Sequence, residues 1–220
     1  MVDITVLVCV YSKDDSSLLK FSLNQLADVE DIYILVVIDG PVSLELKSLA
    51  HEFANEVLEL PVNLGHGLAR RAGMSKVKTP YVAISDADDI SYPYRFDLSR
   101  EYLIANPDCG VVSSSVIEEW ENNKTTIKRI SKNQGFWKYR SPVNQQTALI
   151  RLQSYIEAGG YVDWYHNEDT YLWYRIMKAG WKIGYIDDVL ANVKMNSHSI
   201  SRRRGIKYFV SEISLRALMY

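Results

Sequence analysis

Short apolar runs alternate with amphipathic segments along the first half of the chain. A β-branched run at Ile4–Val10, with similar runs at residues 33–38, 57–60 and 81–84, is typical of strands covered on both faces. The segments between these runs carry apolar residues at helical spacing and are too long to be hairpin turns. The alternation predicts a doubly wound α/β fold, with a mostly parallel central sheet flanked by helices.

The pattern changes after residue 95, where we expect a small mixed β lobe beside the main sheet. A helix over residues 93–105 precedes two extended segments, 111–118 and 125–130, and the polar stretch between these segments predicts a hairpin. Residues 145–150 have the composition of a further strand.

The end of the chain predicts an apolar-rich helix from residue 206 onward, preceded by arginines at residues 202–204. Its apolar face would contain Phe209, Ile213, Leu215 and Leu218. One interpretation is that Phe209, Ile213 and Leu218 pack against the domain. The other is weak peripheral contact of residues 202–220 with an anionic membrane surface, which suits a basic amphipathic segment. Both interpretations stay open at this point.

The composition is that of one soluble globular domain spanning residues 1–220, with 47% apolar and 24% charged residues. The net charge of −2 provides no basic field, so we expect no nucleic-acid partner. Two cysteines are too few for a disulfide framework. The sequence shows neither a signal peptide nor a run long enough to span a membrane. We therefore expect a cytoplasmic protein, whose only possible membrane contact is peripheral, at the inner face of the cell membrane.

Carboxylates crowd the end of the predicted strand at residues 81–84, where Asp86, Asp88 and Asp89 follow within a few residues. Such carboxylates repel one another, so a counter-charge is expected. Mg²⁺ or Mn²⁺ takes oxygen ligands and commonly bridges to a substrate phosphate. A solvated acidic turn is the simpler alternative. The polar residues at the other strand ends favour the metal site.

Polar residues follow each of the other predicted strands, at Tyr11, Asp39 and the loop 63–67. The carboxyl ends of parallel strands meet at one edge of a sheet, where such folds bind ligands. A nucleotide fits these residue types, because Asp39 can accept from a base N–H or a sugar hydroxyl and Arg70 can pair with phosphate. A tight turn at Asp39 and a solvated helix face at Arg70 are the structural alternatives.

A later helix is predicted from Asn167, as its N-cap, to Lys178. Glu168 and Asp169 fall in its first turn, where acids also complement the helix dipole. The aromatic residues at 161–165 favour a second interpretation. In that interpretation, a sugar ring stacks here and a hydroxyl group loses its proton to one of the acids.

Together these motifs resemble glycosyltransferase family 2. The resemblance rests on the ordered set VLVCVYS at residues 6–12, IDG at 38–40, NLGHGLARRAG at 63–73, SDADD at 85–89 and NED at 167–169. It covers nearly the whole chain and implies an inverting, metal-dependent enzyme with the GT-A fold, of the type that builds bacterial surface polysaccharides. It also implies a nucleotide-sugar-binding half at residues 1–95, an acceptor-side half at 96–200 and a C-terminal helix at 201–220.

The resemblance implies a role for each matching residue. Asp169 would be the general base, with Glu168 beside it, and Asp88 the direct ligand of Mn²⁺ or Mg²⁺, with Asp86 near the metal and the sugar. His198 is the late histidine that would join the metal site. The nucleotide-sugar would contact residues at the strand ends and one pair of glutamines, namely Val10, Tyr11, Asp39, Asn63, Arg70, Asp86, Gln145 and Gln146.

The implied reaction moves a sugar from a nucleotide-sugar, a UDP-sugar, to a hydroxyl of a glycan or lipid-linked saccharide in one inverting displacement. A sugar nucleotidyltransferase is an alternative with the same architecture. Such enzymes usually carry a glycine- and basic-rich loop after the first strand, whereas Tyr11 to Asp14 contains no glycine. A non-catalytic nucleotide-sugar-binding module is the other alternative, and the intact Asp86, Asp88 and Asp169 argue against it.

Overall fold

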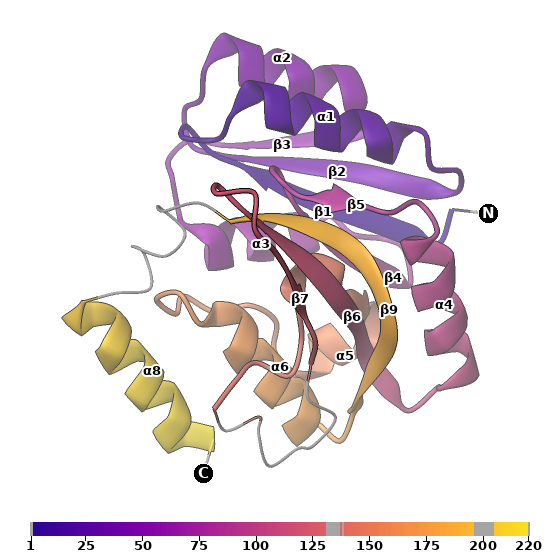
Figure 1. Ribbon diagram of the computed structural model, residues 1–220, viewed down its shortest axis with the longest axis vertical. Coiled ribbons are helices and arrows are strands. Elements are labelled where there is room, and N and C mark those ends of the chain that lie inside the picture. Colours follow the sequence, from indigo (N-terminus) through magenta and orange to yellow (C-terminus); the bar gives the residue numbers. More distant parts are fainter. Residues whose placement is uncertain (1, 131–136, 138, 196–204, 220) are drawn as a thin grey trace.

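The computed structural model describes residues 2–130, 137, 139–195 and 205–219 (Figure 1). Its strands are β1 (Ile4–Val10), β2 (Ile32–Asp39), β3 (Glu56–Leu60), β4 (Tyr81–Asp86), β5 (Ile90–Ser91), β6 (Cys109–Trp120), β7 (Thr125–Lys128), β8 (Leu149–Arg151) and β9 (Lys182–Met195). Its helices are α1 (Ser16–Ala27), α2 (Leu44–Phe53), α3 (His66–Met74), α4 (Arg95–Ala105), α5 (Leu152–Glu157), α6 (Glu168–Lys178) and α8 (Ile206–Met219). A 3₁₀ turn, η2, spans Gln145–Thr147.

All of these strands belong to one sheet in the order β3-β2-β1-β4-β8-β6-β9-β5, with β7 paired to β6. The first four strands of this order are parallel, as the apolar runs predicted. The remainder is mixed, because β8 is antiparallel to β4 and β6, whereas β6 and β9 are parallel. The α/β fold with a mixed β region is therefore confirmed.

Helices cover both faces of the sheet, and alternate residues of β1 point into two cores. Val6 and Val8 pack in a core with residues of α1, α2 and α4. Leu7 packs in the opposite core with residues of α3, α5 and α6, including the fully buried Trp173. Because both faces are covered, the strand reads as one continuous apolar run rather than an alternating one.

The long strand β9 arches across the molecule beside β6 (Figure 1) and is absent from the sequence expectations. Its pairing with β6 has irregular register around Ser114 and Ser115, and exposed acids at Asp187 and Asp188 interrupt its apolar pattern. A strand with such an irregular and half-exposed pattern carries a weak alternation signal. The predicted hairpin is confirmed as β6 and β7.

Some local expectations were wrong. Residues 145–150 are not one strand, because Gln145–Thr147 form the turn η2 and the strand β8 begins at Leu149. Helix α6 does begin after Asn167, but the Asn167 side chain makes no capping bond. Its amide instead donates to Ser211 Oγ of α8, at 3.1 Å.

Helix α8 packs on the domain through a different face from the one expected. Leu215 is buried as predicted, together with Ser211 and Met219. Phe209, Ile213 and Leu218 are 64%, 52% and 52% exposed, so their packing against the domain is contradicted. Ser211 accounts for the choice of face, because its hydroxyl accepts from Trp164 Nε1 at 2.9 Å and donates to the Tyr165 carbonyl at 2.6 Å. Across the described ranges, no helix is both long enough and apolar enough to cross a membrane.

Candidate active site

Two adjoining cavities open at the carboxyl edge of the parallel strands, where the sequence predicted a ligand site. The small cavity, of about 310 Å³, lies at the ends of β1 and β2 and the start of α3. The large cavity, of about 860 Å³, extends from the end of β4 across η2 and the start of α6 to α8. His66 and His166 line both cavities, so the two meet at these histidines.

The small cavity gathers four predicted residues, Val10, Tyr11, Asp39 and Asn63. They meet there because β1 and β2 end side by side and the loop after β3 folds against them. Gly40 allows this approach: its φ is +83°, and a Cβ at this position would lie 2.5 Å from Asn63 N. The cavity therefore depends on close packing of backbone against backbone.

Asp39 is buried and already holds the loop that forms one wall of this cavity. Its Oδ1 accepts from Leu64 N at 2.6 Å and its Oδ2 from Gly65 N at 3.0 Å. Each carboxylate oxygen can accept a further hydrogen bond. Asp39 thus positions the loop through these two bonds and retains acceptor capacity toward the cavity that it lines.

The Arg70 side chain is buried rather than solvated, and it does not line the small cavity. It is 6% exposed, and its guanidinium bridges two acids from distant elements. Nη2 donates to Asp86 Oδ1 at 2.9 Å, and Nη1 donates to Glu168 Oε1 at 3.1 Å. Arg70 therefore connects α3 to β4 and α6 at the inner wall of the large cavity, and the solvated-face alternative is wrong.

Gln145 extends this network to Asp169. In the orientation that gives hydrogen bonds to both amide atoms of Gln145, the amide oxygen lies 2.9 Å from Arg70 Nη1 and the amide nitrogen lies 2.8 Å from Asp169 Oδ2. Asp169 Oδ1 accepts from Thr170 N at 2.6 Å. Asp169 is thus held on both oxygens at the edge of the large cavity, which Gln146 also lines.

The two acids of α6 lie in surroundings that favour their neutral forms. Burial, and after it the charge of Asp169, raise the pKa of Glu168 to about 7 against the opposing charge of Arg70. Burial also raises the pKa of Asp169, against the Thr170 hydrogen bonds and the charge of Arg70. A carboxyl group whose pKa approaches neutrality is suited to accept a proton during catalysis.

The acids after β4 separate into two environments. Asp86 and Asp88 line the large cavity. Asp89 also reaches its wall but is 3% exposed, and its Oδ2 has no hydrogen-bond partner among the described residues. Burial and the neighbouring Asp86 and Asp88 raise the pKa of Asp89 well above its ordinary value. The sequence did not predict this division of the cluster.

The carboxylates facing the cavity suit a hard divalent cation in their donor chemistry. In the described part of the chain, no three His, Cys, Asp or Glu side chains group closely enough to enclose an ion. Asp86 and Asp88 therefore fit a cation that takes its remaining ligands from a bound diphosphate and water. His198, the third expected ligand, lies outside the described residues, and its role stays a prediction.

Sequence reasoning assigned no site role to several other residues that border the two cavities. His66 and His166 lie at the junction, and Lys128, Arg129 and Arg140 line the large cavity. His66 lies within the NLGHGLARRAG motif and His166 directly precedes the NED motif, which was the available signal. Lys128 and Arg129 lie in the segment 125–130, which was predicted only as a strand, and Arg140 lies in a stretch without periodicity, so the sequence offers no such signal for these basic residues.

Comparison with known proteins gives concordant results. The family model described as glycosyl transferase family 2 matches residues 5–161. The amylovoran biosynthesis glycosyltransferase AmsE of Erwinia amylovora is 33% identical, covering 97% of this chain and 84% of its own length. The Escherichia coli UDP-Gal:alpha-D-GlcNAc-diphosphoundecaprenol beta-1,3-galactosyltransferase is 29% identical, covering 98% and 82%.

Solved structures share the fold. Residues 1–349 of S. aureus TarS, in complex with UDP-GlcNAc, align with a TM-score of 0.74 at 16% identity, covering 99% of this chain and 66% of that one. The Pyrobaculum calidifontis mannosyltransferase PcManGT, in complex with GDP-Man and Mn²⁺, aligns with a TM-score of 0.70 at 14% identity, covering 99% and 73%. At these identities the likeness concerns the fold.

Proposed function

The chain belongs to glycosyl transferase family 2, and from this premise we propose that it transfers a sugar from a UDP-sugar to a hydroxyl group of a glycan or glycolipid. The relatives named for amylovoran and O-antigen biosynthesis support a place in bacterial polysaccharide synthesis. The observation that carries the proposal is the position of Asp169. Its carboxylate is held by Gln145 and Thr170 in a cavity shared with the acids after β4.

Asp169 acts as the general base in this proposal. It removes the proton of the acceptor hydroxyl while that oxygen attacks the anomeric carbon from the face opposite the departing diphosphate. This single displacement inverts the anomeric centre. The raised pKa of Asp169 supports the role, because a stronger base accepts the proton more readily. Glu168 binds hydroxyl groups nearby and is itself held by Arg70.

The donor occupies both cavities. The nucleoside lies in the small cavity, where Val10 and Tyr11 line the base pocket and Asp39 and Asn63 offer polar contacts. The diphosphate and sugar extend past the histidine junction toward Asp86, Gln145 and Gln146 in the large cavity. In this arrangement, Arg70 orients the acids around the sugar.

A divalent cation fits the same arrangement. Mn²⁺ or Mg²⁺, held by Asp88 with Asp86 beside it, would neutralise charge that develops on the departing diphosphate. The PcManGT complex contains Mn²⁺, which supports the proposal by fold analogy.

The acceptor is a glycan or a lipid-linked saccharide. The E. coli relative is named for an acceptor joined to diphosphoundecaprenol, which supports the lipid-linked class. We propose that α8 provides weak peripheral contact with the membrane that holds such a lipid. Its outward face exposes Ile206, Phe209, Val210 and Ile213 by more than half of each side chain. The arginines 202–204, which precede α8 in sequence, lie outside the described residues.

The test is nucleotide release. Purified protein is incubated with a panel of UDP-sugars and Mn²⁺, with and without lipid-extract acceptors, and free UDP is measured. We expect one UDP-sugar to raise the melting temperature and to release UDP when acceptor is present. Binding without release, for every donor and acceptor tried, would instead support the non-catalytic binding module.

A further inference from the structure

Acidic and basic residues of the large cavity come mostly from different elements. Apart from Glu212 of α8, the acids come from the end of β4 and the start of α6; apart from Arg70 of α3, the basic residues come from β7 and the residue after it, the segment before η2, β9 and α8. Some of these basic residues are already neutralised. Lys194 Nζ lies 2.8 Å from Glu119 Oε2, and Arg216 Nη2 lies 3.1 Å from Glu212 Oε2.

Arg129 and Arg140 differ from these paired cations. Both line the large cavity and are exposed, and within the described ranges neither guanidinium forms a hydrogen bond or an ion pair. An exposed arginine without a partner is common on a protein surface, but two on the wall of one catalytic cavity provide a charge that a substrate can neutralise. Neither residue lines the small cavity.

The backbone that carries these arginines is tied to the catalytic network. Arg129 directly follows β7, whose last residue, Lys128, accepts from Asn144 Nδ2 through its carbonyl at 3.4 Å. Asn144 also donates to the Ser114 carbonyl at 2.9 Å, and the next residue is Gln145, which contacts Asp169. The basic wall is therefore positioned relative to Asp169 by one short hydrogen-bonded segment.

We propose that Arg129 and Arg140 bind a phosphate or diphosphate group carried by the acceptor; this proposal rests on the proposed glycosyl transfer. Guanidinium groups bind phosphate oxygens in bidentate fashion. With the acceptor anion at this wall, its sugar hydroxyl faces Asp169, while the donor diphosphate remains near Asp86 and Asp88. The acceptor class is therefore a saccharide linked through phosphate rather than a neutral glycan.

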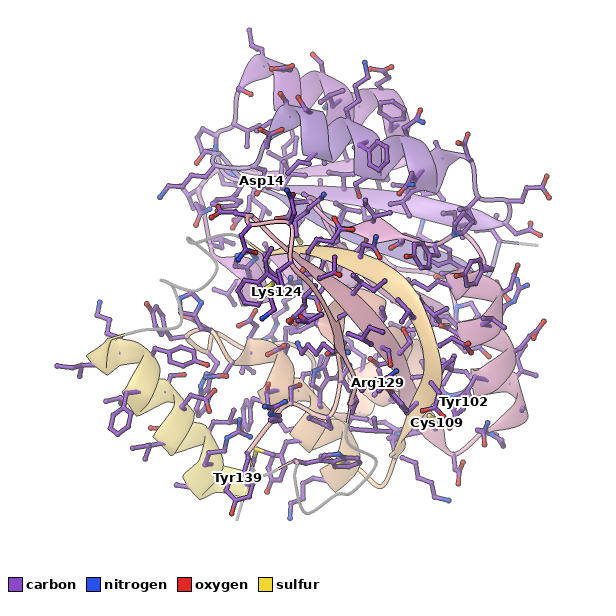
Figure 2. The ribbon with its side chains drawn as sticks, in the orientation of Figure 1. Asp14, Tyr102, Cys109, Lys124, Arg129 and Tyr139 are labelled. Atoms are coloured by element: carbon purple, nitrogen blue, oxygen red, sulfur yellow. The ribbon has the colours of Figure 1, made fainter. Side chains whose placement is uncertain are left out.

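The donor diphosphate is the competing ligand for these arginines, so the experiment fills the donor site first. Binding of octyl diphosphate and of neutral octyl glucoside, the latter as control, is measured by calorimetry with the full chain saturated with UDP and Mn²⁺. The variant is Arg129→Gln with Arg140→Gln. Lys124→Gln is the matched control, since Lys124 precedes β7 on the same hairpin (Figure 2), is exposed and does not line the cavity.

We expect the wild type and Lys124→Gln to bind octyl diphosphate alike and octyl glucoside more weakly. The double variant should bind octyl diphosphate at least about tenfold more weakly, the loss expected for charge-assisted hydrogen bonds, with UDP affinity unchanged. Unchanged octyl diphosphate affinity in the double variant, or no preference of the wild type for the diphosphate, would overturn the proposal. Equal loss of UDP affinity would reassign the arginines to the donor.

Failure of this proposal can be distinguished from failure of the proposed function. If the wild type fails to bind UDP with Mn²⁺, the proposed donor is wrong. Octyl diphosphate binding is then measured without nucleotide, and the comparison of the double variant with Lys124→Gln still decides whether the two arginines form an anion site.

Discussion

At the scale of single residues, Asp169 is the position where a small chemical change separates binding from catalysis. Asp169→Asn keeps the shape and the hydrogen bond from Thr170, but removes basicity and the oxygen that accepts from Gln145. Donor affinity should stay near the wild-type value, and transfer should fall by roughly two to four decades. Calorimetry with UDP and a UDP-release assay measure the two quantities. Asp163→Asn, at an exposed position close in sequence, is the control, and wild-type transfer by Asp169→Asn would reduce Asp169 to a helix-dipole partner.

The metal assignment predicts a different separation at Asp88. Asp88→Ala should abolish the Mn²⁺ dependence of donor binding and leave the fold intact, because a carboxylate at a cavity wall contributes repulsion rather than core packing. Calorimetry with UDP, with and without Mn²⁺, measures the effect. Asp108→Ala is the control, since Asp108 is exposed and pairs with Lys182 at 2.6 Å. Unchanged Mn²⁺ dependence in Asp88→Ala would contradict the assignment.

The acids of α6 also predict how the reaction depends on pH. Burial is the largest influence on both pKa values. The pKa of Glu168 is raised to about 7, and that of Asp169 is raised above 3.8. The charges of Arg70, Asp86 and Lys128 also influence the pair. Because the base must be ionised, the rate should rise with pH until the coupled pair has lost its protons near neutrality. A pH profile of kcat/KM measures this limb, and a midpoint at an ordinary carboxyl pKa would contradict it.

The free energy of unfolding should fall as the pH rises toward neutrality, whereas the rate should rise. The pKa of Glu168 is higher in the folded chain than its ordinary value of 4.5. Its protonated form therefore favours the folded state at low pH, and that contribution is lost as the pH rises through about 7. The burial that raises the pKa of Glu168 thus lowers the free energy of unfolding at neutral pH.

At the scale of helices and strands, Arg70 is the connection between α3, β4 and α6. Arg70→Met removes the cation and leaves Asp86 and Glu168 facing each other without compensation. Breaking a buried ion pair in this way lowers the free energy of unfolding by about 3–5 kcal/mol. Urea denaturation measures the loss. Arg71→Met is the matched control, because Arg71 is exposed and, among the residues that the structure describes, its side chain donates only to the Tyr161 carbonyl. An equal effect at both positions would contradict the role of Arg70.

The elements also show why the sequence predicts part of this site and not the rest. An apolar run ends where its strand ends, so the edge positions of Asp39 and Asp86 follow from the pattern. The partners of Arg70 do not follow, because Glu168 comes from a helix almost a hundred residues later and the two meet only in the folded chain. Family resemblance supplied Gln145, whereas its contact with Asp169 depends on the unexpected turn η2.

The same reasoning applies to α8. Its apolar residues recur around more than one face, so spacing alone does not select the buried side. A polar residue makes the selection instead, since Ser211 bonds to Trp164, Tyr165 and Asn167. The stripe that contains Phe209 and Ile213 is consequently left facing outward.

At the scale of the whole molecule, α8 has two different sides. Tyr208, Glu212 and Arg216 line the large cavity from this helix. Phe209 and Ile213 face away and are exposed. The helix lies on the opposite side of the molecule from α1 and α2 (Figure 1). A membrane contacted by its outer side would therefore lie next to the cavity in which we propose that a lipid-linked acceptor binds, and far from the first two helices.

This arrangement predicts salt-sensitive binding to anionic vesicles. Each arginine near such a surface contributes about 1 kcal/mol, so residues 202–204 add a modest attraction to that of the apolar stripe. Co-sedimentation with anionic liposomes at low and high salt measures it. Phe209→Gln with Ile213→Gln should abolish sedimentation and leave UDP affinity unchanged. Leu44→Gln, at an 85% exposed position of α2 on the other side, should sediment like the wild type. If the wild type fails to sediment even at low salt, the outer side of α8 does not bind membranes.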